Sequence, residues 1–229
     1  MRRQHRLDLL LQRRVVTTRT GEVRRARLAR EGQRGIITLN TVTTITAYDR
    51  HVQQLFDTID RLARALAQAG VEYRVVGGVA VFLHVHERDP LAARSTRDVD
   101  VAVNRRDLEV IIDAVRPVGF EYRHAAGVDM LVDAREPRAR SAVHLVFVGE
   151  KVRPDYAEPV PAFSPAVRTT EGVLLIAVAD LVRMKLTSFR LRDRVHLQDM
   201  DSVGLITSEI ETGLPSALRD RLRDLRTQE

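Results

Sequence analysis

The sequence predicts an α/β, or α+β, fold in which a small mixed sheet carries helices on one face and is followed by a helical C-terminal extension. Three observations support this class. Between residues 50 and 150, segments with helical periodicity alternate with short apolar segments typical of strands. After about residue 179 only helical patterns remain. The 229 residues, 44% hydrophobic and 30% charged, have the composition of a soluble globular protein.

The first half of the folded part contains a helix, a strand and a second helix. Residues 51–69 are predicted to be helical, because apolar residues recur there at helical spacing and a glycine follows as a C-terminal cap. Residues 73–76 form a buried strand that ends at Gly77-Gly78. A short apolar helix over residues 79–84 comes next.

The middle of the chain supplies the remaining strands. A polar loop over residues 86–96 leads to a strand over residues 98–103, and an amphipathic helix over residues 108–115 follows. Two further strands are expected around residues 128–132 and 143–148.

The last third of the chain is predicted to be mostly helical. A proline-rich loop over residues 154–165 precedes residues 172–178, which lead into one long helix over residues 179–203. A final arginine-rich helix carries four leucines on one face, Leu214, Leu218, Leu222 and Leu225.

The net charge is distributed unevenly along the chain. Residues 1–35 hold eleven arginines against three acidic residues, so this segment carries +8 and the remaining residues −2 of the total +6. We therefore predict a basic, flexible arm over residues 1–45, a core over residues 46–170 and the helical extension over residues 171–229. The arm is either a solvated leader or a segment that binds RNA through phosphate contacts.

Composition excludes several classes of protein and site. The chain has no cysteine, which rules out disulfides, cysteine nucleophiles and thiolate metal sites. No apolar run approaches the roughly 20 residues that span a bilayer, and the N-terminus lacks a signal-peptide core. We expect a cytoplasmic protein without a membrane partner.

Two acidic residues in one strand are the strongest chemical signal. Asp98 and Asp100 stand two positions apart, so they project from the same face of the strand. Two such carboxylates are tolerated in water, as a solvated strand end, or around a cation. Oxygen ligands favour Mg²⁺ or Mn²⁺.

The glycine pair upstream supplies the second half of a site. Gly77 and Gly78 follow a strand and open a helix, where backbone N–H groups favour an anion and the missing side chains let a phosphate approach. A tight turn alone also needs glycine. A glycine pair followed by an Asp-x-Asp strand is more specific, since it offers a phosphate cradle beside a divalent-metal site.

This arrangement resembles the nucleotidyltransferase superfamily, which includes DNA polymerase beta, the minimal nucleotidyltransferases and the toxin components of abortive-infection systems. The residues that carry the resemblance are Val75-Val76-Gly77-Gly78-Val79-Ala80 and Thr96-Arg97-Asp98-Val99-Asp100-Val101. Residues 179–186, with the later Arg194 and Asp199, are similar to the helical part of the abortive-infection group. The resemblance covers roughly residues 70–205.

The resemblance implies a function and a set of site residues. Gly77 and Gly78 would hold the triphosphate of an NTP, while Asp98 and Asp100 would bind Mg²⁺ or Mn²⁺ and take part in catalysis. Arg94, Thr96 and Lys185 are the further candidates for substrate contact. The acceptor would be an RNA, a protein or a small molecule, and a toxin-like role would add an antitoxin as partner.

Lysine usage singles out Lys185 independently. The chain uses arginine 35 times and lysine only at Lys151 and Lys185. Lys185 lies on a largely apolar helix face, where a charge needs a partner. The ammonium either extends to solvent or contacts a phosphate or carboxylate.

Two departures from the family pattern keep a second interpretation open. Nineteen residues separate Gly78 from Asp98, more than the usual dozen or so. In the strand expected to supply a third carboxylate, His144 takes its place. His144 could act as a base, or Asp129 could replace the acid from the neighbouring strand. The alternative is a catalytically inactive protein that binds nucleotide or RNA.

Overall fold

The computed structural model describes residues 41–94, 96, 98–135 and 142–227, with side chains from residue 52 onward. The predicted basic arm falls largely outside the described residues, and residues 41–45 already belong to the first described helix. Within the described part of the chain, no helix is both long and apolar enough to cross a membrane.

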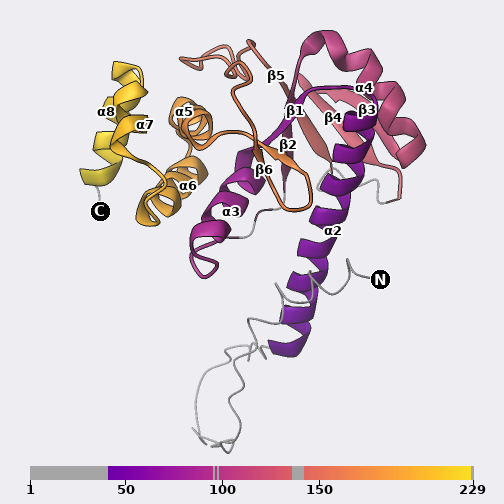
Figure 1. The fold of residues 1–229 in the computed structure, drawn as a ribbon, viewed down its shortest axis with the longest axis horizontal. Helices are drawn as coiled ribbons and strands as arrows, with labels where there is room; N and C mark the ends of the chain where they lie inside the picture. The colour runs from indigo at the N-terminus through magenta and orange to yellow at the C-terminus, as the bar shows by residue number, and fades with distance from the viewer. Residues whose placement is uncertain (1–40, 95, 97, 136–141, 228–229) are drawn as a thin grey trace, which may run out of the picture. The chain divides into compact units, whose positions relative to one another are not determined.

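Strands and helices alternate through the core and helices dominate the C-terminal part (Figure 1). The strands are β1 (Tyr73–Val76), β2 (Val99–Val103), β3 (Phe120–Ala125), β4 (Val128–Asp133), β5 (Val143–Phe147), β6 (Val167–Arg168) and β7 (Leu174–Leu175). The α-helices are α2 (Thr41–Gln68), α3 (Gly77–Arg88), α4 (Leu108–Val115), α5 (Val178–Ser188), α6 (Leu191–Ser202), α7 (Ser208–Gly213) and α8 (Ser216–Thr227). Two 3₁₀ turns, η1 (Arg105–Asp107) and η2 (Arg116–Val118), flank α4.

The strands form one mixed sheet in the order β3-β4-β5-β2-β1-β7-β6. β2 runs parallel to β5 and antiparallel to β1, and β1 runs parallel to β7. The register pairs Asp100 with Val76 of β1 and with His144 of β5. Asp100 therefore lies between the end of the first strand and the start of the fifth.

Each face of the sheet has its own apolar core. Val101 and Leu145 belong to the core formed with α2 and α4. Val76 and Ala102 belong to the core formed with α3, α5, α6 and α8. Figure 1 shows the C-terminal helices gathered on one side of the strands. The predicted α/β class is confirmed, but helices cover both faces because the C-terminal extension packs back on the sheet.

The extension is also joined to the sheet by hydrogen bonds. β6 and β7 pair with each other across the predicted boundary at residue 170, and β7 pairs with β1. The two-residue strands were not expected from the sequence, because such short segments carry no periodicity. β3 was also not expected; it has six residues but only Phe120 is buried, so it lacks the apolar pattern of a strand.

The prediction of one helix over residues 179–203 was wrong. The helix breaks at Phe189, which adopts a left-handed conformation with φ of 44°. Asp193, in the first turn of α6, accepts a hydrogen bond from the backbone N–H of Arg190 and so caps the second helix. The break folds α6 back so that Asp193 meets Lys185 of α5.

Candidate active site

A pocket of about 300 Å³ lies where the end of β1 and the starts of β2 and β5 meet α3, α5 and α6. Its lining includes most of the residues that the sequence singled out. The lining residues are Gly78, Thr96, Asp98, Asp100, His144, Lys185, Arg190, Arg192, Asp193 and His196.

His144 lies directly opposite Asp100. The two residues pair in register, and the Nδ1 atom of His144 is 3.3 Å from an Oδ atom of Asp100. This hydrogen bond raises the pKa of His144 above its usual value; burial opposes the shift, and the charges of Asp100 and Asp98 add to it. The pair thus has the geometry in which a carboxylate orients an imidazole.

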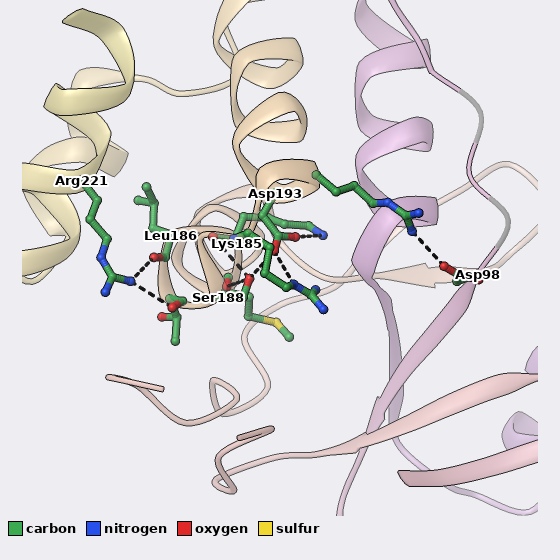
Figure 2. A network of polar contacts seen from close by, with 10 residues as sticks. Asp98, Lys185, Leu186, Ser188, Asp193 and Arg221 are labelled. Atoms are coloured by element: carbon green, nitrogen blue, oxygen red, sulfur yellow. Dashed lines mark hydrogen bonds and ion pairs between the residues drawn. The ribbon is translucent and has the colours of Figure 1, made fainter. Parts of the chain in front are cut away.

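Asp98 is held by a cation from the helical extension. The Nη1 atom of Arg192, in α6, lies 3.0 Å from an Oδ atom of Asp98 (Figure 2). The Arg192 side chain is 70% exposed and that of Asp98 42% exposed. Exposed pairs of this kind contribute only about 0–1 kcal/mol, so a ligand can displace Arg192 at little cost.

The glycine pair brings the backbone close to the acidic strand. Gly77 has φ of +68°, and a Cβ atom added there would meet the carboxylate of Asp100, with the Cγ atom at 2.8 Å. A Cβ atom on Gly78 would lie 2.5 Å from the hydroxyl oxygen of Thr96. Gly77 therefore needs glycine for conformation and for contact, whereas Gly78 needs it for contact alone.

The start of α3 presents backbone donors near this pocket. Val76, the residue before the helix, makes no side-chain capping hydrogen bond. The first N–H groups of a helix have no partner within the helix and carry a partial positive charge. Together with Gly78 in the lining, they can hold an anionic group.

Lys185 has a carboxylate partner. Its ammonium lies 3.0 Å from Asp193 (Figure 2), and both side chains are buried, at 8% and 1% exposure. Burial alone would raise the pKa of Asp193, but the Lys185 charge and hydrogen bonds from Arg190, Lys185 and Ser188 lower it to about 2. The pair forms one wall of the pocket.

The other predicted contacts lie differently. Thr96 is buried and lines the pocket. Arg94 does not line it: its Nε atom donates to Asp199 at 2.9 Å, and its side chain is 68% exposed. Arg94 thus lies outside the pocket lining, and its contact with substrate stays a prediction.

Asp129 cannot replace the third carboxylate. It pairs in register with Leu145, whereas Met130 pairs with His144, so Asp129 projects from the opposite face of the sheet. There it accepts hydrogen bonds from Tyr122 at 2.6 Å and His124 at 2.9 Å.

Four lining residues were missed from the sequence, Arg190, Arg192, Asp193 and His196. All follow the break at Phe189. The available signal was an acidic residue at the third position of a possible new helix, Asp193 after Arg190. It was hidden by the continuous helical pattern of residues 179–203.

The donor set suits a cation held partly by substrate. Among the described residues, no group of three or more His, Cys, Asp or Glu side chains is placed to hold a metal ion. Mg²⁺ commonly binds one or two carboxylates and completes its shell with phosphate oxygens and water. Asp98 and Asp100 fit this mode of binding, in which two carboxylates supply only part of the shell.

Comparisons with known proteins bear on the fold. No protein-family model matches this chain, and no curated protein matches it significantly. The crystal structure of an antigenic nucleotidyltransferase-like protein from Paracoccidioides brasiliensis is similar, with a TM-score of 0.52 and 17% identity over 77% of this chain and 89% of that one. This similarity shows a nucleotidyltransferase-like fold.

Two further solved structures are similar to a lesser degree. One is ANT(2″)-Ia in complex with adenylyl-2″-tobramycin, with a TM-score of 0.47 and 12% identity over 75% of this chain and 98% of that one. The other is the Megavirus polyadenylate synthase, with a TM-score of 0.48 and 10% identity over 81% of this chain and 41% of that one.

Proposed function

We propose that this protein is a metal-dependent nucleotidyltransferase, which moves a nucleoside monophosphate from an NTP to an acceptor hydroxyl or phosphate. One observation carries the proposal: the carboxylates of Asp98, just before β2, and Asp100, within β2, line the same pocket as Gly78 at the start of α3. The nucleotidyltransferase-like fold supports it.

The pocket walls suggest how the substrate lies. The backbone at Gly77 and Gly78 holds phosphate oxygens at the helix start. Lys185 and Thr96 line the same pocket and contact the triphosphate chain. Asp98 and Asp100 would hold Mg²⁺ or Mn²⁺, which would neutralise charge on the phosphates and the leaving group.

His144 is the proposed base. Asp100 accepts the Nδ1–H of His144, which leaves the Nε2 lone pair free to take the proton of the acceptor hydroxyl. The acceptor oxygen forms a bond to the α-phosphorus as the bond to the bridging oxygen breaks, and pyrophosphate leaves. Most of the rate enhancement comes from positioning and electrostatic stabilisation.

The acceptor is an RNA, a protein or a small molecule. A toxin-like role, with an antitoxin as partner and a place in abortive infection, belongs to the same proposal and rests on the sequence resemblance alone.

Transfer of label from nucleotide to acceptor tests the proposal. Each of the four NTPs, labelled at the α-phosphate, is incubated with the protein, Mg²⁺ or Mn²⁺, and total RNA, total protein or a small-molecule pool. We expect one NTP to label one acceptor class in a metal-dependent way. The Asp98→Asn/Asp100→Asn variant is the control and should transfer nothing.

A specific observation favours a second candidate, a nucleotide-binding or RNA-binding protein without catalysis. Asp129 faces away from the pocket, and Asp193, the third acid in the lining, is paired with Lys185, so among the described residues only Asp98 and Asp100 lie beside His144 as candidate metal ligands. Binding of an NTP without transfer to any acceptor would support this function and contradict catalysis. Absence of NTP binding would contradict both nucleotidyl transfer and a nucleotide-binding function.

A further inference from the structure

His196 is a buried polar side chain in the pocket with no assigned role. It lies on α6, is 9% exposed and lines the pocket. Its Cε1 atom is 3.5 Å from the position that a Cβ atom on Gly78 would occupy. The imidazole therefore lies beside the start of α3.

The Nδ1 atom of His196 has no hydrogen-bond partner within the described part of the chain. Nδ1 is fully enclosed. Because the imidazole lines the pocket and Nδ1 is enclosed, Nε2 is the ring nitrogen left for a molecule in the pocket. A buried polar group without a partner destabilises the folded state by about 1–3 kcal/mol.

The ring is neutral at physiological pH. Burial, followed by the charge of Lys185, lowers the pKa of His196 to about 4; Asp193 opposes this shift, while Arg192 and Arg190 add to it. A neutral imidazole has one N–H and one lone pair. A proton on Nδ1 would be an enclosed N–H donor without an acceptor, which costs more than an enclosed lone pair. The proton of the neutral ring therefore belongs on Nε2.

A second buried histidine shows the contrast. His84, on α3, is 3% exposed, and burial also lowers its pKa. Its Nε2 atom, however, lies 2.8 Å from the carbonyl oxygen of Ile176. His84 thus has the partner that a structural histidine needs, whereas the enclosed Nδ1 atom of His196 has none.

We propose that His196 contacts substrate, donating a hydrogen bond from Nε2 to a phosphate oxygen of the bound NTP. The assignment rests on the proposed function and deepens it. A triphosphate would give this donor an acceptor in the pocket.

The neighbours of His196 identify phosphate as the group bound. Lys185, Arg190 and Arg192 line the same pocket, and the N-terminus of α3 is adjacent. Cations, helix N–H groups and a neutral N–H donor all favour an anionic oxygen. A nucleobase or a ribose would make favourable contacts with fewer of these cations and N–H donors.

The test measures stability and affinity in the same variants. The probes are the α,β-methylene analogues of the four NTPs and inorganic triphosphate, titrated with Mg²⁺ by calorimetry. His196→Leu keeps an apolar side chain of similar size but cannot donate. His196→Gln retains an N–H donor. His84→Leu is the matched control.

His196→Leu is expected to lower the affinity for the ligand and to raise the stability of the fold. His196→Leu should weaken binding of the analogue and of inorganic triphosphate by about tenfold, yet unfold at a higher temperature because an unpaired polar group is gone. His196→Gln should recover part of the affinity. His84→Leu should unfold at a lower temperature and bind as wild type does.

Other results would overturn the assignment. Unchanged affinity in His196→Leu, with wild type binding an analogue, refutes the contact but leaves the proposed function intact. Weaker nucleotide binding with unchanged triphosphate binding refutes a phosphate contact. A wild-type protein that binds no analogue refutes both proposals. A lower unfolding temperature with unchanged affinity shows a structural histidine.

Discussion

Two carboxylate clusters lie on opposite faces of the same sheet, and they differ in how completely their oxygens are paired. On one face, Asp129 is buried and receives hydrogen bonds from Tyr122, His124 and Arg105. On the other face, Asp98 and Asp100 are partly exposed, with hydrogen bonds from Arg192 and His144 respectively. The first cluster is complete without a ligand, whereas the second retains oxygens for one.

This difference separates stability from function. A buried carboxylate whose donors are all protein groups contributes to folding and has little capacity for a ligand. A partly exposed pair of like charges in a pocket contributes little to folding and attracts a cation. Both clusters contain Asp, His and Arg, so residue type alone does not distinguish them.

The largest expected effect is on activity. Asp98→Asn/Asp100→Asn removes both anionic ligands, and transfer should fall by at least about a thousandfold, roughly 4 kcal/mol of transition-state stabilisation. Stability should change little, since both side chains are partly exposed. Label transfer and thermal unfolding are measured on the same preparation. Retained activity would show that the wrong cluster was assigned to the site.

The next effect is on stability and concerns the wall of the pocket. Lys185→Met leaves the buried Asp193 carboxylate without its ammonium partner. Losing one member of a buried ion pair costs about 3–5 kcal/mol. Urea unfolding measures the loss. Lys185→Met/Asp193→Leu, which removes both charges, should recover much of it; failure to recover would mean that packing, not charge, explains the single variant.

Asp129 should behave in the opposite way to the pocket acids. Asp129→Asn weakens three hydrogen bonds to a buried carboxylate, so we expect a loss of about 2 kcal/mol in unfolding free energy. Nucleotide binding and transfer should remain. A fall in activity without a fall in stability would contradict the assignment of Asp129 to folding.

The pH dependence of this variant provides a check. Burial raises the pKa of Asp129, but hydrogen bonds from Tyr122 and His124 and the charge of Arg105 outweigh it and lower the pKa below 3.8. The carboxylate therefore stabilises the fold fully above the unfolded pKa, and this contribution is lost as the pH falls through the folded value. The difference in stability between wild type and Asp129→Asn should shrink below about pH 4.

The smallest expected stability effect comes from the glycines. Gly77→Ala and Gly127→Ala both place a side chain at positive φ, +68° and +74°, and the backbone conformation alone should cost about 1–2 kcal/mol in each. Only at Gly77 would the new Cβ atom meet Asp100; at Gly127 nothing lies within 4 Å. We expect Gly77→Ala to lose Mn²⁺ and nucleotide binding in addition, measured by calorimetry. Equal Mn²⁺ and nucleotide binding in the two variants would show that Gly77 is not part of the binding site.

Local patterns predicted most of the core correctly. The range 73–76 was predicted for β1 and 108–115 for α4, as observed. Buried strands and amphipathic helices have short-range signals, namely period, glycine and proline positions. The same patterns placed the glycines at a helix start and Asp100 on a strand, whereas Asp98, predicted on that strand, lies one residue before it.

Register and packing decided the rest. Periodicity alone cannot tell which residue of a neighbouring strand lies opposite Asp100, because a shift of one residue exchanges the two faces. The observed register brings His144 to the pocket and turns Asp129 away from it.

By itself, the sequence determined the α/β class, the acidic strand and the glycine turn, since these depend on neighbours along the chain. Only the tertiary structure decided which residues after Phe189 line the pocket, namely Arg190, Arg192, Asp193 and His196. Phe189 breaks the helix at positive φ, and its ring lies under the guanidinium groups of Arg194 and Arg221 at 4.5 and 5.4 Å. Those contacts join residues from separate helices, and so does the approach of His196 to Gly78, which no local pattern encodes.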